Sequence, residues 1–112
     1  MKVAIYTRVS GKSNRQDAAN QSLQLVEYCQ RQGWDYVEYT DRMSGTRADR
    51  AAFLQMFEDA RLRRFDMVLF RALDRFSREG TLKTLEYFQR LDSYGVAWKS
   101  RARADAPSHE TR

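Results

Sequence analysis

The first apolar run of the chain is followed by an arginine and a serine. The run covers residues 3–6, and Arg8 and Ser10 come directly after it. In open α/β sheets, ligands bind in the crevice outside the carboxyl ends of the strands. The planar guanidinium fork of arginine matches the oxygens of a phosphate. The pattern therefore predicts a serine that reacts with a phosphate group or lies beside one. The alternative is that Ser10 caps the next helix and that Arg8 is a solvated charge.

Two further apolar or β-forming stretches also end in polar residues. Asp41 and Ser44 follow the stretch 34–40. The run 67–70 is followed by Arg71, Asp74, Arg75 and Arg78. Because the carboxyl ends of parallel strands meet at one edge of a sheet, we expect these side chains to converge on Ser10.

A hydroxyl, two carboxylates and several guanidiniums in one place predict phosphoryl transfer, because the arginines would neutralise charge on the transferring group. Arg47 or Arg50, at the start of the second expected helix, can add a further guanidinium. A Ser-His-Asp triad needs a histidine, and the only one is His109 near the end of the chain. The sequence also has no Gly-x-Ser-x-Gly motif, no Walker A loop and no dinucleotide-binding fingerprint.

Asp41 and Asp74 leave a metal-dependent alternative open. Magnesium needs only one or two protein carboxylates, so a phosphatase or nuclease could be built on this pair. The surrounding arginines argue against it, since they would supply the same positive charge. Asp74 and Arg75 could also form a simple ion pair that closes a turn.

The composition indicates one globular, moderately basic domain. The chain has 112 residues and 20 Lys+Arg against 15 Asp+Glu, a net charge of +5, which favours a polyanionic partner such as DNA. The single cysteine, Cys29, excludes an internal disulfide and is expected to be buried. No apolar run approaches the roughly 20 residues that cross a bilayer, and no signal peptide is evident, so we expect a cytoplasmic protein.

Strand-like and helix-like segments alternate along the chain. We expect strands at about 3–6, 34–40, 67–70 and 96–98, separated by three helices at about 16–32, from Asp49 as N-cap to about 61, and from 77 or 78 to 94. This order predicts an α/β fold with three layers and a mostly parallel, about four-stranded sheet. The stretch 34–40 carries two acidic residues and is expected at an edge, and 41–47 is expected to be a loop.

Each helix has an apolar stripe that should face the sheet. The expected inward residues are Ala19, Leu23, Val26 and Cys29; Phe53, Met56, Phe57 and Ala60; and Leu82, Leu85, Phe88 and Leu91. From residue 100 the hydrophobic periodicity disappears. We therefore expect a domain over 1–99 and an irregular tail over 100–112.

At this point several motifs, in order and spacing, resemble a known family. They are Tyr6-Thr7-Arg8-Val9-Ser10, Asn20-Gln21, Asp41, Ser44-Gly45, Asp49-Arg50 and the stretch 73–80, Leu-Asp-Arg-Phe-Ser-Arg-Glu-Gly. The chain resembles the catalytic domain of the serine recombinases, the resolvase and invertase group, from about residue 1 to 99.

The resemblance implies a role for each matching residue. Ser10 would attack a DNA phosphodiester and become a 5′-phosphoserine. The arginines that would bind phosphate or stabilise the transition state are Arg8, Arg50, Arg75 and Arg78. Asp74 and Arg78 are the candidates for protonating the leaving 3′-oxygen. Supporting or phosphate-binding positions would be Tyr6, Gln21, Asp41, Ser44 and Arg71, of which Arg71 is the least securely matched. The family works on DNA without metal or other cofactor.

Relatives continue beyond this region into a long dimerisation helix and a helix-turn-helix DNA-binding domain. Here the resemblance stops after Ser100, so we expect both parts to be absent and the chain to be a monomer or weak dimer, whereas full-length relatives act as dimers and tetramers. The remaining alternative is a truncated recombinase remnant that folds without catalysing.

Overall fold

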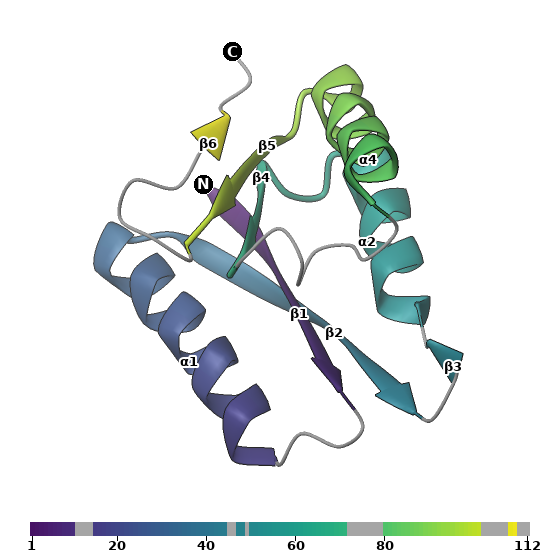
Figure 1. Ribbon diagram of the computed structural model, residues 1–112. Helices are drawn as coiled ribbons and strands as arrows, with labels where there is room; N and C mark the ends of the chain where they lie inside the picture. Colours follow the sequence, from purple (N-terminus) through teal and green to yellow (C-terminus); the bar gives the residue numbers. More distant parts are fainter. Residues whose placement is uncertain (11–14, 45–46, 49, 72–79, 102–107, 110–112) are drawn as a thin grey trace.

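The computed structural model describes residues 1–10, 15–44, 47–48, 50–71, 80–101 and 108–109. The elements, in chain order, are β1 (Lys2–Ser10), α1 (Arg15–Gln32), β2 (Asp35–Ser44), β3 (Arg47–Ala48), α2 (Ala51–Arg61), β4 (Met67–Phe70), α4 (Thr81–Tyr94), β5 (Ala97–Ser100) and β6 (Ser108–His109). Figure 1 shows them in the order in which they follow one another.

The strands form one sheet in the order β3-β2-β1-β4-β5-β6. The four central strands, β2, β1, β4 and β5, pair in parallel. The two-residue strands β3 and β6 pair antiparallel at the two edges of the sheet. The predicted α/β fold with a mostly parallel, about four-stranded sheet is therefore confirmed. For most of its length β2 has only β1 as a neighbour, which agrees with the expected edge strand.

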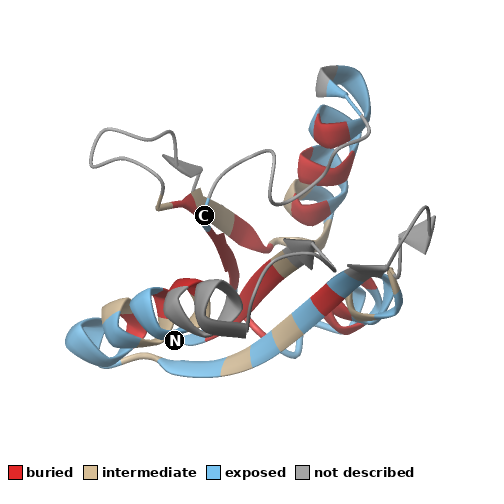
Figure 2. Ribbon diagram, turned by 60° about the horizontal axis from the view of Figure 1, so that its bottom comes forward, coloured by how far each residue is buried: buried red, intermediate tan, exposed pale blue. Residues whose placement is uncertain are grey.

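Helices cover both faces of the sheet, so the predicted three layers are confirmed (Figure 1). α1 packs on one face through Leu25 and Cys29, which contact the odd-numbered residues of β1 and β4. α2 and α4 pack on the other face in a cluster that includes Phe53, Phe57 and Phe88. Figure 2 shows that burial concentrates on the central strands and on the helix sides that face them. All four residues of β4 are buried.

The predicted inward stripe was right for α2 and partly wrong for the other two helices. Phe53, Met56, Phe57 and Ala60 are all buried, as is Cys29. In α1, however, Leu23 is 53% exposed and Leu25 is buried. The two residues are roughly 200° apart around a helix of 3.6 residues per turn, so only one can face the sheet.

In α4 the buried side is shifted in the same way. Leu82 and Leu85 are 75% and 51% exposed, and the buried residues are Thr84, Tyr87, Phe88 and Leu91. The aromatic pair decides the orientation: Phe88 stacks on Trp98 of β5 at 3.9 Å between ring centroids, and Tyr87 contacts Phe53 of α2 at 4.9 Å. Burying large aromatic rings outweighs burying two leucines.

Three segments are more extended than predicted. β1 and β2 stay paired from Lys2↔Asp35 to Ser10↔Met43, so Asp41 lies within a strand and not in a loop. The segment expected to be an irregular tail contributes Ser100 to β5 and residues 108–109 to β6. In each case pairing with a neighbouring strand satisfies backbone groups that the local sequence does not mark as β-forming. The division of the chain at residue 99 stays a prediction.

The first testable consequence concerns α1. Leu25→Ala should lower the free energy of unfolding by about 2–5 kcal/mol, because it opens a cavity between helix and sheet. Leu23→Ala, the same change two residues away, should cost less than about 0.5 kcal/mol because Leu23 is largely in water. Urea denaturation of both variants measures this difference. Equal losses would contradict the described orientation of α1.

Candidate active site at the carboxyl end of the sheet

β1 and β2 project beyond the end of β4, and this overhang carries the predicted site residues. The last β1 residue paired with β4 is Tyr6, opposite Phe70. Beyond it, Arg8 is paired only with Asp41 of β2, and Ser10 is the last residue of β1. Arg8 is half-buried. The predicted nucleophile therefore belongs to the part of β1 that extends past the pairing with β4.

The Asp41 carboxylate joins β2 to the start of α2. Its Oδ1 accepts the backbone N–H of Ala52 at 2.8 Å, and its Oδ2 accepts that of Phe53 at 2.9 Å. These are second and third residues of the helix, whose N–H groups have no partner inside it. The N-cap residue itself, Arg50, makes no side-chain capping bond. A strand residue thus caps α2; the expected cap, Asp49, lies outside the described residues.

Tyr6 completes the contacts of this carboxylate. Its hydroxyl donates to Asp41 Oδ2 at 2.8 Å, and both side chains are buried. Burial raises the pKa of Tyr6 far above its ordinary value, with a smaller contribution from the hydrogen bond and the charge of Asp41. Tyr6 is therefore protonated at neutral pH and acts as a fixed donor, which makes it a positioning residue.

The three donors also bear on the metal-dependent alternative. Both oxygens of Asp41 accept hydrogen bonds, and the side chain is only 2% exposed. A divalent cation bound there would have to displace backbone N–H groups that already complement the carboxylate. Within the described residues no group of three or more His, Cys, Asp or Glu side chains could hold a metal ion. These contacts disfavour a site built on Asp41; Asp74 lies outside the described residues.

Arg50 is held at the start of α2 by two aromatic rings. Its Nη2 donates to the hydroxyl of Tyr87 at 2.8 Å, and its guanidinium carbon lies 4.8 Å from the centre of the Phe53 ring and 5.7 Å from that of Tyr87. Phe53 also contacts Tyr6 edge-on at 5.4 Å. A single aromatic cluster thus links Arg50 to the Tyr6–Asp41 pair. Tyr87 is not among the predicted site residues, because the leucine pattern of α4 predicts a different inward face.

Of the other predicted site residues, some lie within the described part of the chain and some lie outside it. Gln21 is buried on α1, and its Oε1 has no hydrogen-bond partner among the described residues. Ser44 is the last residue of β2, and Arg71 is exposed directly after β4. Asp74, Arg75 and Arg78 lie outside the described residues. The structure therefore brings together Tyr6, Asp41 and Arg50, with Arg8 beside Asp41 in the strand register.

Comparison with known proteins gives the family. The model of the resolvase N-terminal domain matches residues 3–111. The chain belongs to this resolvase family. No curated protein matched the chain. No helix in the described part of the resolvase-family chain is long and apolar enough to cross a membrane.

Solved structures of serine recombinases share this fold. A resolvase family site-specific recombinase from Streptococcus pneumoniae superposes with a TM-score of 0.84 at 25% identity, over 96% of this chain and 75% of that one. The N-terminal catalytic domain of TP901-1 integrase is 33% identical, with a TM-score of 0.74 over 91% and 78% of the two chains. The C-terminal catalytic domain of ISC1926 TnpA, an IS607-like serine recombinase, is 26% identical, with a TM-score of 0.77 over 90% and 70%.

The Tyr6–Asp41 bond makes a testable contribution to stability. Tyr6→Phe should cost about 1–3 kcal/mol at neutral pH, because it removes one donor from a buried charge. The folded state keeps a proton that the unfolded chain loses near pH 10, so the stability contributed by Tyr6 is complete below about pH 10 and declines above it. The difference between wild type and Tyr6→Phe should therefore shrink as pH rises.

Urea unfolding at neutral and alkaline pH measures both effects. The matched control is Tyr36→Phe, the same chemical change on an exposed strand position, which should alter stability by less than about 0.5 kcal/mol at every pH. A pH-independent gap between Tyr6→Phe and wild type would contradict the assignment.

Proposed function

We propose that this serine recombinase domain cleaves and rejoins DNA through a covalent bond between Ser10 and a 5′-phosphate. The observation that carries the proposal is the overhang of β1 and β2. Arg8 and the backbone of Ser10 belong to the part of β1 that extends past its pairing with β4, and Asp41, the strand partner of Arg8, caps the helix start at which Arg50 is held. The family match and the family's known action on DNA support DNA as the partner.

The proposed step is an in-line phosphoryl transfer. The Oγ of Ser10 forms a bond to phosphorus as the bond to the 3′-oxygen breaks; the serine loses its proton, and the departing oxygen gains one. Negative charge grows on the phosphoryl oxygens during this step, and Arg8 and Arg50 can approach it from β1 and from the start of α2. Arg75 and Arg78 are proposed to join them. Preorganised cationic donors of this kind supply a large share of the stabilisation in such reactions.

Two observations bear on which groups act as acid and base in this proposal. Asp41 already accepts three hydrogen bonds, and Tyr6 keeps its proton, so neither is suited to exchange protons with DNA. Their role is to hold α2, and with it Arg50, against the end of the sheet. Asp74 and Arg78 stay the candidates for protonating the leaving 3′-oxygen.

The same chemistry explains how strands could be rejoined without a cofactor. The covalent intermediate is itself a phosphodiester, between Ser10 and the 5′-oxygen, which replaces the bond to the 3′-oxygen; the 3′-hydroxyl of a partner strand can therefore attack it and release Ser10. Hydrolysis by a metal-activated water would instead leave a phosphate monoester, which a strand hydroxyl cannot rejoin without an energy source. Absence of a cofactor is part of the proposal, as is a cytoplasmic location, which DNA as substrate implies.

We also propose that the chain is a monomer or a weak dimer in solution. Leu82 and Leu85 are exposed on α4, and an apolar surface of this kind favours weak association. Sedimentation velocity across micromolar concentrations should show mostly monomer. A stable tetramer under these conditions would contradict this part of the proposal.

The covalent step can be tested by placing this chain in the position of the catalytic domain of a full-length family member. Nicked DNA carrying the site of that member, incubated in excess chelator, should give a protein–DNA adduct that survives denaturing electrophoresis. Ser10→Ala should abolish the adduct. Arg50→Ala should slow its formation roughly 10²–10³-fold, the usual cost of one preorganised donor.

Two further variants separate charge from position. Arg42→Ala removes an exposed arginine of β2 next to Asp41 and should have little effect on the rate. Tyr87→Phe keeps the ring under Arg50 but removes the hydroxyl acceptor, so it should slow the reaction less than Arg50→Ala. An adduct that persists in Ser10→Ala, or cleavage that needs magnesium and leaves no linked protein, would overturn the proposed chemistry.

A further inference from the structure

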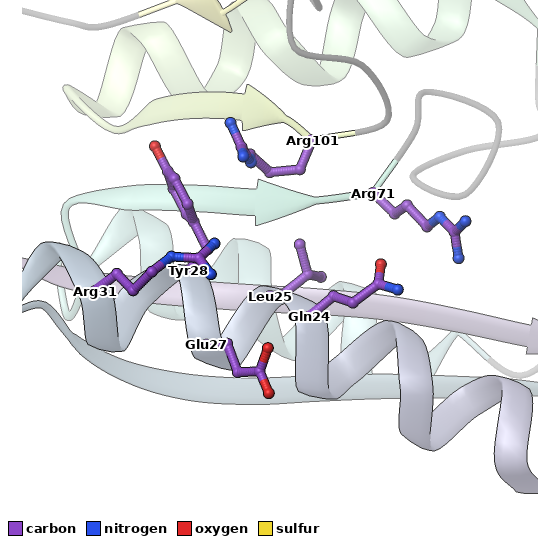
Figure 3. A pocket seen from close by; sticks show the side chains of 7 residues that line it. All are labelled: Gln24, Leu25, Glu27, Tyr28, Arg31, Arg71 and Arg101. Carbon is purple, nitrogen blue, oxygen red and sulfur yellow. The ribbon is translucent and has the colours of Figure 1, made fainter.

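A second cluster of arginines lines a pocket on the α1 side of the sheet. The pocket has a volume of about 270 Å³ and lies between α1 and the carboxyl ends of β4 and β5. Figure 3 shows Arg31 of α1, Arg71 after β4 and Arg101 after β5 around it. Among the described residues that line the pocket, Glu27 is the one with a carboxylate. Arg50 and its aromatic cluster are on the other face, with α2 and α4.

Arg101 is held in place by an aromatic ring and by the sheet. Its guanidinium carbon lies 4.0 Å from the centre of the Tyr28 ring, and its backbone N–H donates to the carbonyl of Phe70 at 2.9 Å. Tyr28 is itself fixed: its hydroxyl accepts from Lys99 Nζ at 3.1 Å, and its ring meets Trp34 edge-on at 5.7 Å. A cation positioned before binding loses less entropy when it meets an anion.

The backbone of Arg71 is anchored from the same strand. The buried hydroxyl of Ser100 donates to the carbonyl of Arg71 at 3.1 Å. The side chain is exposed, and Figure 3 shows it extending from the end of β4 toward Gln24 of α1. Within the part of the chain that the structure describes, none of the three arginines, Arg31, Arg71 and Arg101, forms an ion pair.

The charges of this pocket favour an anion with several oxygens. Arginines from three different elements line the pocket, Lys99 is close by, and Glu27 is the one acidic residue among the described residues that line it. One carboxylate ligand would occupy a single arginine fork, whereas a phosphate offers oxygens in several directions. The pocket also lies at the carboxyl ends of parallel strands, where α/β sheets bind ligands.

We propose that this pocket binds a phosphate group and that the group is a backbone phosphate of DNA. The second half of the proposal rests on the proposed function, because it takes DNA to be the substrate. A phosphate held here would position DNA from the α1 side of the sheet while the reaction takes place at the overhang of β1. The other source of the same chemistry is a free phosphate.

The DNA arm of the test compares two double variants of equal charge. Arg71→Gln/Arg101→Gln removes two arginines of the pocket, and Arg61→Gln/Arg64→Gln removes two at the end of α2, outside it. Each lowers the net charge from +5 to +3. In fluorescence-anisotropy titrations of a duplex over a range of salt, the pocket variant should bind more weakly. Its plot of log K against log salt should flatten by about one unit relative to the control, as for one lost phosphate contact.

A change of opposite sign strengthens the test. Glu27→Gln removes the carboxylate of the pocket and should increase DNA affinity. Glu86→Gln, the same change on exposed α4, should alter it less. If the two arginine doubles give the same affinity and salt slope, and the two glutamate variants also agree, a DNA phosphate in this pocket is excluded.

The free-phosphate arm uses the same full chain without DNA. Inorganic phosphate, added at constant ionic strength, should shift the NMR signals of Tyr28, Arg71 and Arg101, and these shifts should be lost in Arg71→Gln/Arg101→Gln.

Shifts with phosphate, together with equal DNA binding by the two arginine double variants, would assign the site to a free phosphate and overturn DNA as the source of the phosphate. No phosphate shifts and no difference between the doubles would overturn the pocket altogether. Failure of every variant and of wild type to bind DNA would instead count against the proposed function, and the phosphate titration would still decide the pocket.

Discussion

The buried carboxylate of Asp41 is the contact on which the geometry of the candidate site depends. It takes two N–H groups from the start of α2 and one hydroxyl from β1, so three elements meet at one side chain. A buried charge without donors would be strongly destabilising. These donors compensate it, and as a result α2 cannot slide along the sheet without breaking several charge-assisted hydrogen bonds. The first residues of α2 are thereby fixed relative to the overhang of β1.

Fixing α2 also fixes the electrostatics of the overhang. Arg50 lies at the N-terminal end of the helix, where the helix dipole is positive, so cation and dipole add in the same place. A positive charge there is unfavourable for an isolated helix, but it suits a site that must receive a phosphodiester. The rings of Phe53 and Tyr87 offset part of that cost through their contacts with the guanidinium. Under the proposed function, this local loss of helix stability is the cost of a cation placed to receive the phosphate.

The sequence predicted the elements that follow from local patterns. The inward face of α2 was predicted correctly because the helix has one main apolar face. The strand β4 was predicted correctly because all four of its residues are apolar. α4 has two overlapping apolar faces, and contacts with Trp98 and Phe53, distant in sequence, decide between them. The capping by Asp41 spans more than ten residues, so no capping motif marks it. The family motifs identified Arg8, Asp41 and Arg50, while Tyr87 carries no such signal.

The position of Arg101 beside the pocket also could not be predicted from local sequence patterns. Arg101 falls in a segment without hydrophobic periodicity, which predicts an irregular tail, yet its backbone continues the hydrogen bonding of β5 to β4. Pairing of one residue beyond the strand is enough to bring its guanidinium over Tyr28. Because β4 and β5 end earlier than β1 and β2, the sheet has a stepped carboxyl edge. Arg50 lies on the face covered by α2 and α4, whereas Arg71 and Arg101 line the pocket on the α1 face, so the two proposed phosphate contacts come from opposite faces of the sheet.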